Sequence, residues 1–191
     1  VCDMSSDIFS RQMDYSAFDL IYAGAQKNLG PAGATLVVVR KDILGKSGRY
    51  IPTMLDYPTH IKGESMYNTP PVFSLYVSLL TLRWMDAQGG LPEMERRANA
   101  RAAAIYGEID RNPLFVGTAA TEDRSPMNAC FLLHDESAHK DVFDGLAKEA
   151  GLVGLAGHRS VGGYRASMYN ALEQSSVDAL VEVMREVERR A

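Results

Sequence analysis

The chain has 191 residues, a net charge of −4 and 46% hydrophobic residues, a composition that favours a packed core over disorder. Its charges form no basic run, so we expect neither nucleic acid nor an anionic membrane as a partner. No apolar run reaches the roughly 18 residues that cross a bilayer.

The sequence begins Val1-Cys2-Asp3-Met4, without an initiator methionine, a signal peptide or a polar tail. This segment has the pattern of an apolar strand that needs neighbouring strands. We therefore expect the fold to continue upstream of Val1.

The first forty residues have an α/β pattern. Short apolar runs at 20–23 and 35–39, bounded by Gly and Pro, predict buried strands of a mostly parallel sheet. The stretch 41–71 is long and irregular, and loops of this length are usually functional or cover a partner.

A helix is predicted next, with Asn68 or Thr69 as its cap, Pro70 in its first turn and the glycines at 89–90 as its end. Its apolar residues recur at helical spacing and predict core packing. These residues are Phe73, Val77, Leu80 and Trp84.

The rest of the chain predicts a compact α+β unit of about 80 residues after a linking helix. The expected elements are a helix over 92–110, a strand at 130–133, a helix stripe from Val142 to Ala150, strands at 152–153 and 164–169, and a last helix that Ser175 and Asp178 begin as a capping box. We expect the boundary near Gly90, which gives domains 1–90 and 91–191.

Lys27 is the most informative residue because it follows a buried strand directly and has small neighbours. Partial burial would lower the pKa of its amine and make it nucleophilic, as Schiff-base chemistry requires. The alternative is a loop lysine with its amine in water.

Asp3 stands at the end of a probable strand. Parallel strands present functional residues at their carboxyl ends, so Asp3 and Lys27 could face one crevice. A carboxylate suits the ring nitrogen of a pyridoxal cofactor. The alternative is a turn cap, which the nearby Ser5 and Ser6 favour.

Two arginines in the last third have side chains that suit bidentate recognition of a carboxylate or phosphate. Arg165, Ser167 and Tyr169 share one strand face, which could line a cleft. Surface ion pairs are the alternative for Arg159 and Arg165. The glycines of 151–157 lack the spacing of a nucleotide-binding loop and predict turns.

Two cysteines without a CxxC pair give no disulfide framework, which predicts a reducing, cytoplasmic setting. The four histidines lack metal-ligand spacing, so no zinc site is expected.

Several motifs, in order along nearly the whole chain, closely resemble the phosphoserine aminotransferase family of class-V, fold-type-I aminotransferases. They lie at 3–6, 23–28, 30–33, 67–71, 157–163, 165–167 and 169–170. The resemblance implies the end of a large α/β domain that binds pyridoxal 5'-phosphate over 1–90, and a small α+β domain with its linking helix over 91–191. It also implies a homodimer.

The resemblance also implies a role for each matching residue. Lys27 would hold pyridoxal 5'-phosphate, Asp3 would face its ring nitrogen and Gln26 would contact it. Asn68 and Thr69 would reach the cofactor phosphate of the partner subunit. His158 and Arg159 would bind the substrate phosphate or the distal carboxylate of glutamate, and Arg165 would bind the α-carboxylate.

The implied reaction converts glutamate and 3-phosphohydroxypyruvate into 2-oxoglutarate and phosphoserine. The cofactor-stacking aromatic and further donors of the family are missing from this sequence, so the chain alone is expected to be incomplete and inactive. Two alternatives remain: another fold-type-I pyridoxal enzyme with a different substrate, and a non-catalytic fragment. Visible absorbance of a bound cofactor would separate the enzymes from the fragment.

Overall fold

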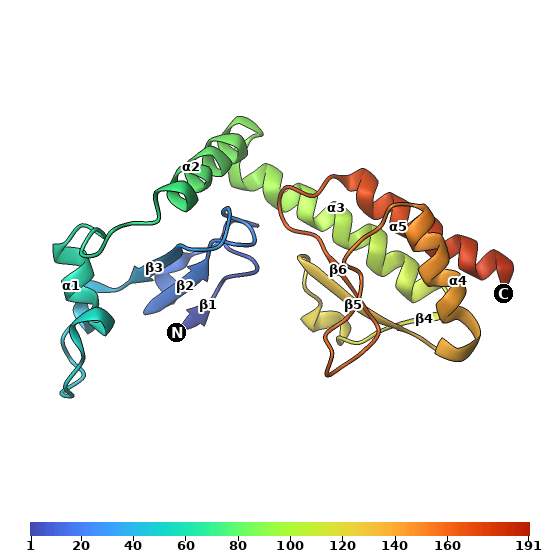
Figure 1. The fold of residues 1–191 in the computed structure, drawn as a ribbon, viewed down its shortest axis with the longest axis horizontal. Coiled ribbons are helices and arrows are strands. Elements are labelled where there is room, and N and C mark those ends of the chain that lie inside the picture. The colour runs from blue at the N-terminus through green and yellow to red at the C-terminus, as the bar shows by residue number, and fades with distance from the viewer. The chain divides into compact units, whose positions relative to one another are not determined.

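A computed structural model describes residues 1–191, which divide into two compact units, Val1–Leu91 and Pro92–Ala191. We call these unit 1 and unit 2. Figure 1 colours them along the chain, with unit 1 from blue to green and unit 2 from green to red. None of the helices combines the length and the apolar character that a membrane span requires.

Unit 1 is built on a three-stranded sheet in the order β1 (Cys2–Asp3), β2 (Leu20–Gly24) and β3 (Thr35–Val39). The two predicted strands are present, but no residue of β3 is buried, and the prediction of a mostly parallel sheet is wrong here. β1 and β2 are parallel, whereas β2 and β3 are antiparallel. The connection 25–34 contains no helix and is shorter than the dozen or so residues that a parallel crossover needs.

The core of unit 1 is small. It joins the inward side chains of β2 to the turns that follow β1 and β2. Its buried members are Met4, Ile8, Ile21, Ala23, Ala25 and Leu29. A short 3-10 helix over Tyr15–Ala17 begins at Asp14, whose carboxylate accepts from the amide of Ser16. The core therefore fixes the two turns at the carboxyl ends of the parallel strands.

The stretch 41–71 contains more regular structure than its composition predicts. It has 3-10 turns at Lys41–Ile43 and Thr53–Leu55, and a helix α1 over Tyr57–Lys62. α1 is too short to produce a periodic apolar pattern, and the proline in its first turn has the appearance of a loop residue. Sequence periodicity therefore could not indicate it.

Helix α2 spans Val72–Ala87 and corrects two predictions. Pro71 occupies the N-cap position without a side-chain hydrogen bond, so neither Asn68 nor Thr69 caps the helix. Phe73 is 72% exposed and Leu80 is 42% exposed, so the predicted stripe is not a core of this chain. The helix is apolar around most of its surface, and periodicity alone could not indicate which side would be buried.

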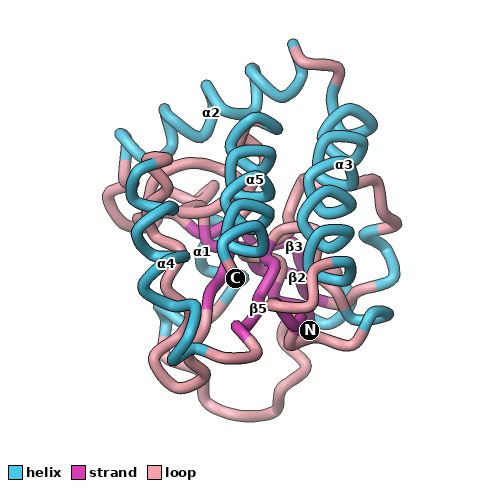
Figure 2. Tube along the Cα trace, turned by 90° about the vertical axis from the view of Figure 1, so that its right-hand side faces the viewer, coloured by secondary structure: helices cyan, strands magenta, loops and turns pink.

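Unit 2 has helices on one face of an antiparallel sheet of order β4-β5-β6. Its elements are α3 (Gly90–Arg111), β4 (Phe115–Gly117), a 3-10 turn (Thr121–Asp123), β5 (Asn128–Leu133), α4 (Glu136–Glu149), β6 (Tyr164–Ser167) and α5 (Gln174–Arg190). Figure 2 shows α5 between α3 and α4. The predicted helices and the strands at 130–133 and 164–169 are confirmed in outline, while β4 was not predicted.

Two details of the unit 2 prediction are wrong. Residues 152–153 form no strand, because Gly151 and Gly154 on either side have positive φ angles of 72° and 74° and turn the backbone away from a ladder. α5 begins at Gln174 with Glu173 at its N-cap and no side-chain cap, so Ser175 does not form a capping box.

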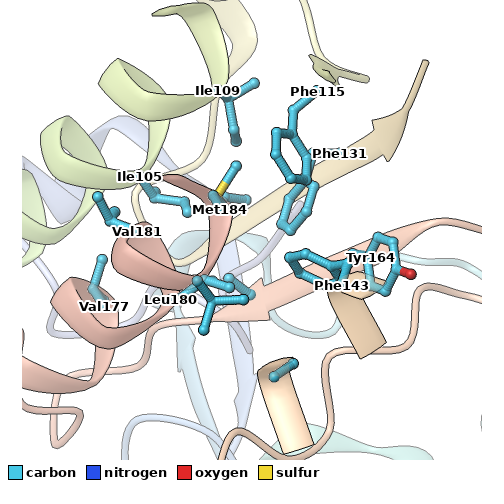
Figure 3. Packing of buried hydrophobic residues seen from close by; sticks show 14 of the residues in the cluster. Ile105, Ile109, Phe115, Phe131, Phe143, Tyr164, Val177, Leu180, Val181 and Met184 are labelled. Atoms are coloured by element: carbon cyan, nitrogen blue, oxygen red, sulfur yellow. The ribbon is translucent and has the colours of Figure 1, made fainter. Parts of the chain in front are cut away.

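The core of unit 2 explains why this part of the chain folds around its sheet. Alternate residues of β5 point at the helices, among them Phe131. Its ring meets Phe115 and Phe143 edge to face and stacks on Tyr164 at a centroid distance of 5.5 Å. Figure 3 shows these rings beside the apolar side chains of α3 and α5. The opposite face of the sheet carries both polar and apolar side chains, and none of them is buried.

An ionic cluster around one buried carboxylate joins α3 to α5 beside this core. The side chain of Glu108 is 1% exposed and accepts from Arg111 Nη2 at 2.6 Å and Nε at 3.2 Å, from Arg185 Nε at 3.0 Å and from Asn112 Nδ2 at 3.1 Å. Burial raises the pKa of Glu108, but the hydrogen bonds from these three residues outweigh it and hold the pKa below the usual value of 4.5.

Replacing Glu108 with Gln is expected to lower the free energy of unfolding by about 2 kcal/mol at pH 7, because the half-exposed Arg111 and Arg185 lose the buried carboxylate that accepts their hydrogen bonds. The pKa of Glu108 is lower in the folded state than in the unfolded state, so its contribution to stability is complete above the unfolded pKa and is lost as the pH falls through the folded pKa. The gap between wild type and Glu108→Gln should therefore shrink below about pH 4.5 in urea unfolding. Glu182→Gln, which removes an exposed partner of Arg189, is the control and should change stability by less than about 1 kcal/mol.

Candidate functional site

Asp3 and Lys27 lie at the same end of the unit 1 sheet. Asp3 is the last residue of β1, and Lys27 is in the turn that follows β2. The parallel register pairs Asp3 with Tyr22, near the end of β2. The positive charge of Lys27 acts on the carboxylate of Asp3 across this edge. A primary amine and an acidic group therefore share the carboxyl edge of two parallel strands.

Hydrogen bonds keep the carboxylate of Asp3 ionised. The hydroxyl and the backbone amide of Ser5 both donate to it, the amide at 2.9 Å, and lower the pKa of Asp3 together with the charge of Lys27. The phenol of Tyr22 also donates a hydrogen bond to this carboxylate, which raises the pKa of Tyr22. Asp3 therefore does act as a turn cap, the alternative role that the sequence offered. Its carboxylate still has lone pairs for another partner.

The turn over 25–30 holds Lys27 outward. The amides of Leu29 and Gly30 both donate to the carbonyl of Ala25, at 3.2 and 2.7 Å. Asn28 is buried, and its Nδ2 donates to the carbonyls of Ile8 at 3.0 Å and Ser6 at 3.3 Å. The expectation that Lys27 is partly buried is wrong for this chain, because its neighbours occupy the interior and its own side chain is exposed.

Small residues around the turn make room for close packing. A Cβ atom at Gly24 would come within 2.5 Å of the Gln26 side-chain oxygen, because the Gln26 side chain folds over the open side of Gly24. Helix α2 packs against the other side of the turn. There Ser74 Oγ donates to the carbonyl of Ala32 at 2.8 Å, and Gly33 has a φ of 117°.

Asn68 and Thr69 are exposed in the segment between α1 and α2. The Nδ2 of Asn68 donates to the carbonyl of Thr69 at 3.3 Å. Their polar groups are thus presented outward, next to the start of α2.

His158 and Arg159 stand at the tip of a loop in unit 2 whose neck is built from glycine. The amide of Gly157 donates to the carbonyl of Gly163 at 2.8 Å, and a Cβ atom at Gly157 would collide with the carbonyl of Gly162. His158 Nδ1 lies 2.7 Å from Ser160 Oγ and accepts from the Ser160 amide at 3.3 Å. A backbone amide can only donate, so this geometry leaves Nε2 of a neutral His158 as the outward donor.

Arg165 lies on β6, on the sheet face that the helices leave uncovered. Tyr164 and Ala166 are buried in the core, whereas Arg165 is exposed and Ser167 is half-buried. This alternation agrees with the predicted face of β6. Arg165 thus presents a guanidinium on the same unit as His158 and Arg159.

The predicted residues fall into two groups. Unit 1 carries Asp3, Gln26, Lys27, Asn68 and Thr69. Unit 2 carries His158, Arg159 and Arg165. The first group offers a primary amine beside an ionised acid, and the second offers cations and donors for an anion.

Sequence reasoning missed two residues that support these groups, Asn28 and Asn128. Ser5 was indicated by its spacing from Asp3, which is that of an Asx turn, and its amide does donate to the carboxylate. Asn28 and Asn128 act through contacts with distant segments, which no local pattern encodes.

The profile of the family described as Aminotransferase class-V matches residues 1–180. Phosphoserine aminotransferase of Flavobacterium psychrophilum is 65% identical over 190 residues, which cover 100% of this chain and 53% of the relative. The protein of the same name from Parabacteroides distasonis is 59% identical over 191 residues, which cover 100% of this chain and 54% of the relative. The chain spans about half the length of the curated relatives it matches.

Solved structures of aminotransferases also have folds similar to that of this chain. Phosphoserine aminotransferase of Bacillus circulans subsp. alkalophilus superposes with a TM-score of 0.92 at 46% identity, covering 98% of this chain and 52% of that one. The PLP-bound enzyme of Trichomonas vaginalis gives a TM-score of 0.88 at 39% identity, covering 96% and 52%. Alanine–glyoxylate aminotransferase of Nostoc sp. has a TM-score of 0.76 at 20% identity over 97% and 52%, a likeness of fold alone.

Proposed function

Because this chain belongs to the class-V aminotransferase family, we propose that it forms part of a phosphoserine aminotransferase. The enzyme transfers the amino group of glutamate to 3-phosphohydroxypyruvate and yields phosphoserine and 2-oxoglutarate, a step of serine biosynthesis. The names of the most similar relatives support this substrate pair. The observation that carries the proposal is the amine of Lys27 beside the ionised Asp3 at the carboxyl edge of β1 and β2.

The residues of unit 1 fit pyridoxal 5'-phosphate as the cofactor. Ser5 keeps the carboxylate of Asp3 charged, as a protonated ring nitrogen requires of its partner. Gly24 leaves space for the amide of Gln26, and the amine of Lys27 is exposed beside them. When bound, the cofactor supplies an electron sink for the substrate α-carbon.

Lys27 has two tasks in this proposal. Its Nζ would hold the cofactor covalently. As a free amine it would take a proton from the substrate α-carbon as general base and return it as general acid. Asp3 would keep the ring nitrogen charged, and Gln26 would contact the cofactor.

Unit 2 recognises the substrate. Arg165 takes the α-carboxylate in a bidentate geometry, which a planar guanidinium suits. His158 and Arg159 take the phosphate of phosphoserine or the distal carboxylate of glutamate. The outward Nε2 of His158 and the exposed Arg159 are donors suited to such an anion.

The enzyme is a homodimer in this proposal, with α2 in the interface. This helix exposes large apolar side chains, and exposed patches of this kind usually mark protein interfaces. They are Val72, Phe73, Leu75, Tyr76, Leu79, Leu80 and Leu82. Asn68 and Thr69, just ahead of α2, donate to the cofactor phosphate of the partner subunit.

We place the enzyme in the cytoplasm. Cys2 and Cys130 are both free thiols, which suits a reducing compartment.

The assay that tests the function uses the holoenzyme with glutamate and 3-phosphohydroxypyruvate, and measures phosphoserine. Turnover with this acceptor should exceed turnover with glyoxylate or pyruvate. Preference for a non-phosphorylated acceptor would assign the enzyme to another substrate. Absence of cofactor absorbance in the visible range would rule out a pyridoxal enzyme.

Replacing Arg159 with Ala in the holoenzyme is expected to raise the KM for phosphoserine about tenfold more than the KM for glutamate. A phosphate with two charges loses more than a carboxylate does when one cation is removed. Steady-state kinetics with both amino acids measures the ratio. Equal losses for the two substrates would give Arg159 a structural role instead.

A further inference from the structure

Three polar side chains meet on the face of unit 2 that carries Arg165. Asn128 begins β5 and is the direct cross-strand partner of Ser167 on β6. Its Oδ1 accepts from Ser167 Oγ at 3.1 Å and from the hydroxyl of Tyr169 at 3.4 Å. Ser167 follows Arg165 by two positions on the same strand face, roughly 7 Å along the strand. The side-chain oxygen of Asn128 thus accepts from two hydroxyls on the strand face that also carries Arg165.

The backbone of Asn128 is itself fixed from two sides. Its carbonyl accepts from the Tyr106 hydroxyl at 3.1 Å, and its amide donates to Ser125 Oγ at 3.3 Å. Next to it, the amide of Met168 donates to the carbonyl of Met127 at 2.7 Å. The acceptor oxygen therefore sits on a rigid support that joins α3, β5 and the end of β6.

We propose that Asn128 is a positioning residue for recognition of the substrate α-carboxylate by Arg165, an inference that rests on the function proposed above for Arg165. An amide oxygen has two lone pairs and can accept from both hydroxyls. Ser167 and Tyr169 then have their protons directed at Asn128 and offer only acceptor lone pairs to their surroundings. A guanidinium only donates, so acceptors two positions along the strand face of Arg165 orient its planar fork for the α-carboxylate.

The first test is Asn128→Ala in the holoenzyme. The KM values for glutamate and phosphoserine should rise together, about three- to tenfold, because both substrates carry an α-carboxylate and one or two hydrogen bonds are lost. The kcat should change by less than about twofold and the visible absorbance of the cofactor should be unchanged. Thr118→Val removes a hydroxyl bond of 3.3 Å to the carbonyl of Cys130 on the same strand and should leave both KM values unchanged.

A double-mutant cycle tests whether Asn128 acts on KM through the hydroxyls of Ser167 and Tyr169. Ser167→Ala with Tyr169→Phe removes the two donors and should raise KM by the same factor as Asn128→Ala. Adding Asn128→Ala to that pair should then have no further effect. Additive losses would overturn the proposal, as would a fall in kcat alone or a lower Tm with unchanged KM. If Asn128→Ala does not fold, the Ser167→Ala, Tyr169→Phe pair replaces it, and an unchanged KM for the pair overturns the proposal.

Calorimetric binding of glutarate to the holoenzyme separates this proposal from the proposed function, because it needs no turnover. The same variants should weaken glutarate binding by the same factors. If the wild type does not turn over glutamate and 3-phosphohydroxypyruvate, the proposed function fails, while the glutarate cycle still tests Asn128. Unchanged glutarate affinity in Asn128→Ala would overturn the positioning role even in an active enzyme.

Discussion

Lys27→Ala in the holoenzyme is expected to lower transamination by at least about a thousandfold. Lys27 provides both the covalent attachment of the cofactor and the proton transfer at the substrate α-carbon. General acid–base catalysis alone contributes about 10²- to 10⁴-fold, and the covalent role adds to this. The exposed position of Lys27 in this chain means that the substitution opens no cavity in the core, so the loss should be chemical.

Two measurements check this result. Borohydride treatment of the wild-type holoenzyme, followed by digestion and mass spectrometry, should place the cofactor on the peptide that contains Lys27. Lys46→Ala removes another exposed lysine of unit 1 and should retain full activity. Cofactor on a different lysine, with Lys27 unmodified, would give the catalytic role to that residue.

Arg165→Lys is expected to raise the KM for glutamate and for phosphoserine by about a hundredfold each, with the cofactor still bound. Lysine keeps the positive charge but loses the planar fork that makes two parallel hydrogen bonds. Hydrogen bonds to charged groups contribute about 1.5–3 kcal/mol, and a loss of 2.7 kcal/mol is about a hundredfold. Both substrates should be affected because both carry the α-carboxylate.

The control for Arg165 is Arg96→Lys, since Arg96 is exposed on α3 and pairs with Glu93 at 2.7 Å. Its kinetic constants should equal those of the wild type. Steady-state KM values and cofactor absorbance are measured for both variants. A loss confined to phosphoserine would move Arg165 to the phosphate end of the substrate, which is the place proposed for Arg159.

Local patterns were sufficient to predict the strands β2 and β3 and the helices α3, α4 and α5. Each of these has either a short apolar run or a stripe repeating at helical spacing, although no residue of β3 is buried in this chain. The same patterns failed for α2, where apolar residues cover most of the helix surface. Burial of that surface depends on what lies against it, which a sequence pattern does not contain.

Strand direction and turn geometry were decided by tertiary structure. Nothing in the apolar run of β3 indicates that it is antiparallel to β2, because the register depends on the path of the connecting turn. The run at Leu152 and Val153 is similar to a strand in composition, but the positive φ angles of the flanking glycines prevent pairing.

The sequence by itself determined the identities and the order of the candidate chemical groups. It indicated Lys27 after a buried strand, Asp3 at the end of another, and the polar face of β6 that carries Arg165. These inferences needed only residue type, strand alternation and the matching family motifs.

Only the tertiary structure decided how those groups are held. It placed Asn28 under the turn of Lys27 and Asn128 against the hydroxyls on the strand face of Arg165. Asn28 and Asn128 make hydrogen bonds to residues 20 to 41 positions away. Such contacts form only when the chain brings distant segments together, so no local pattern of residues can encode them.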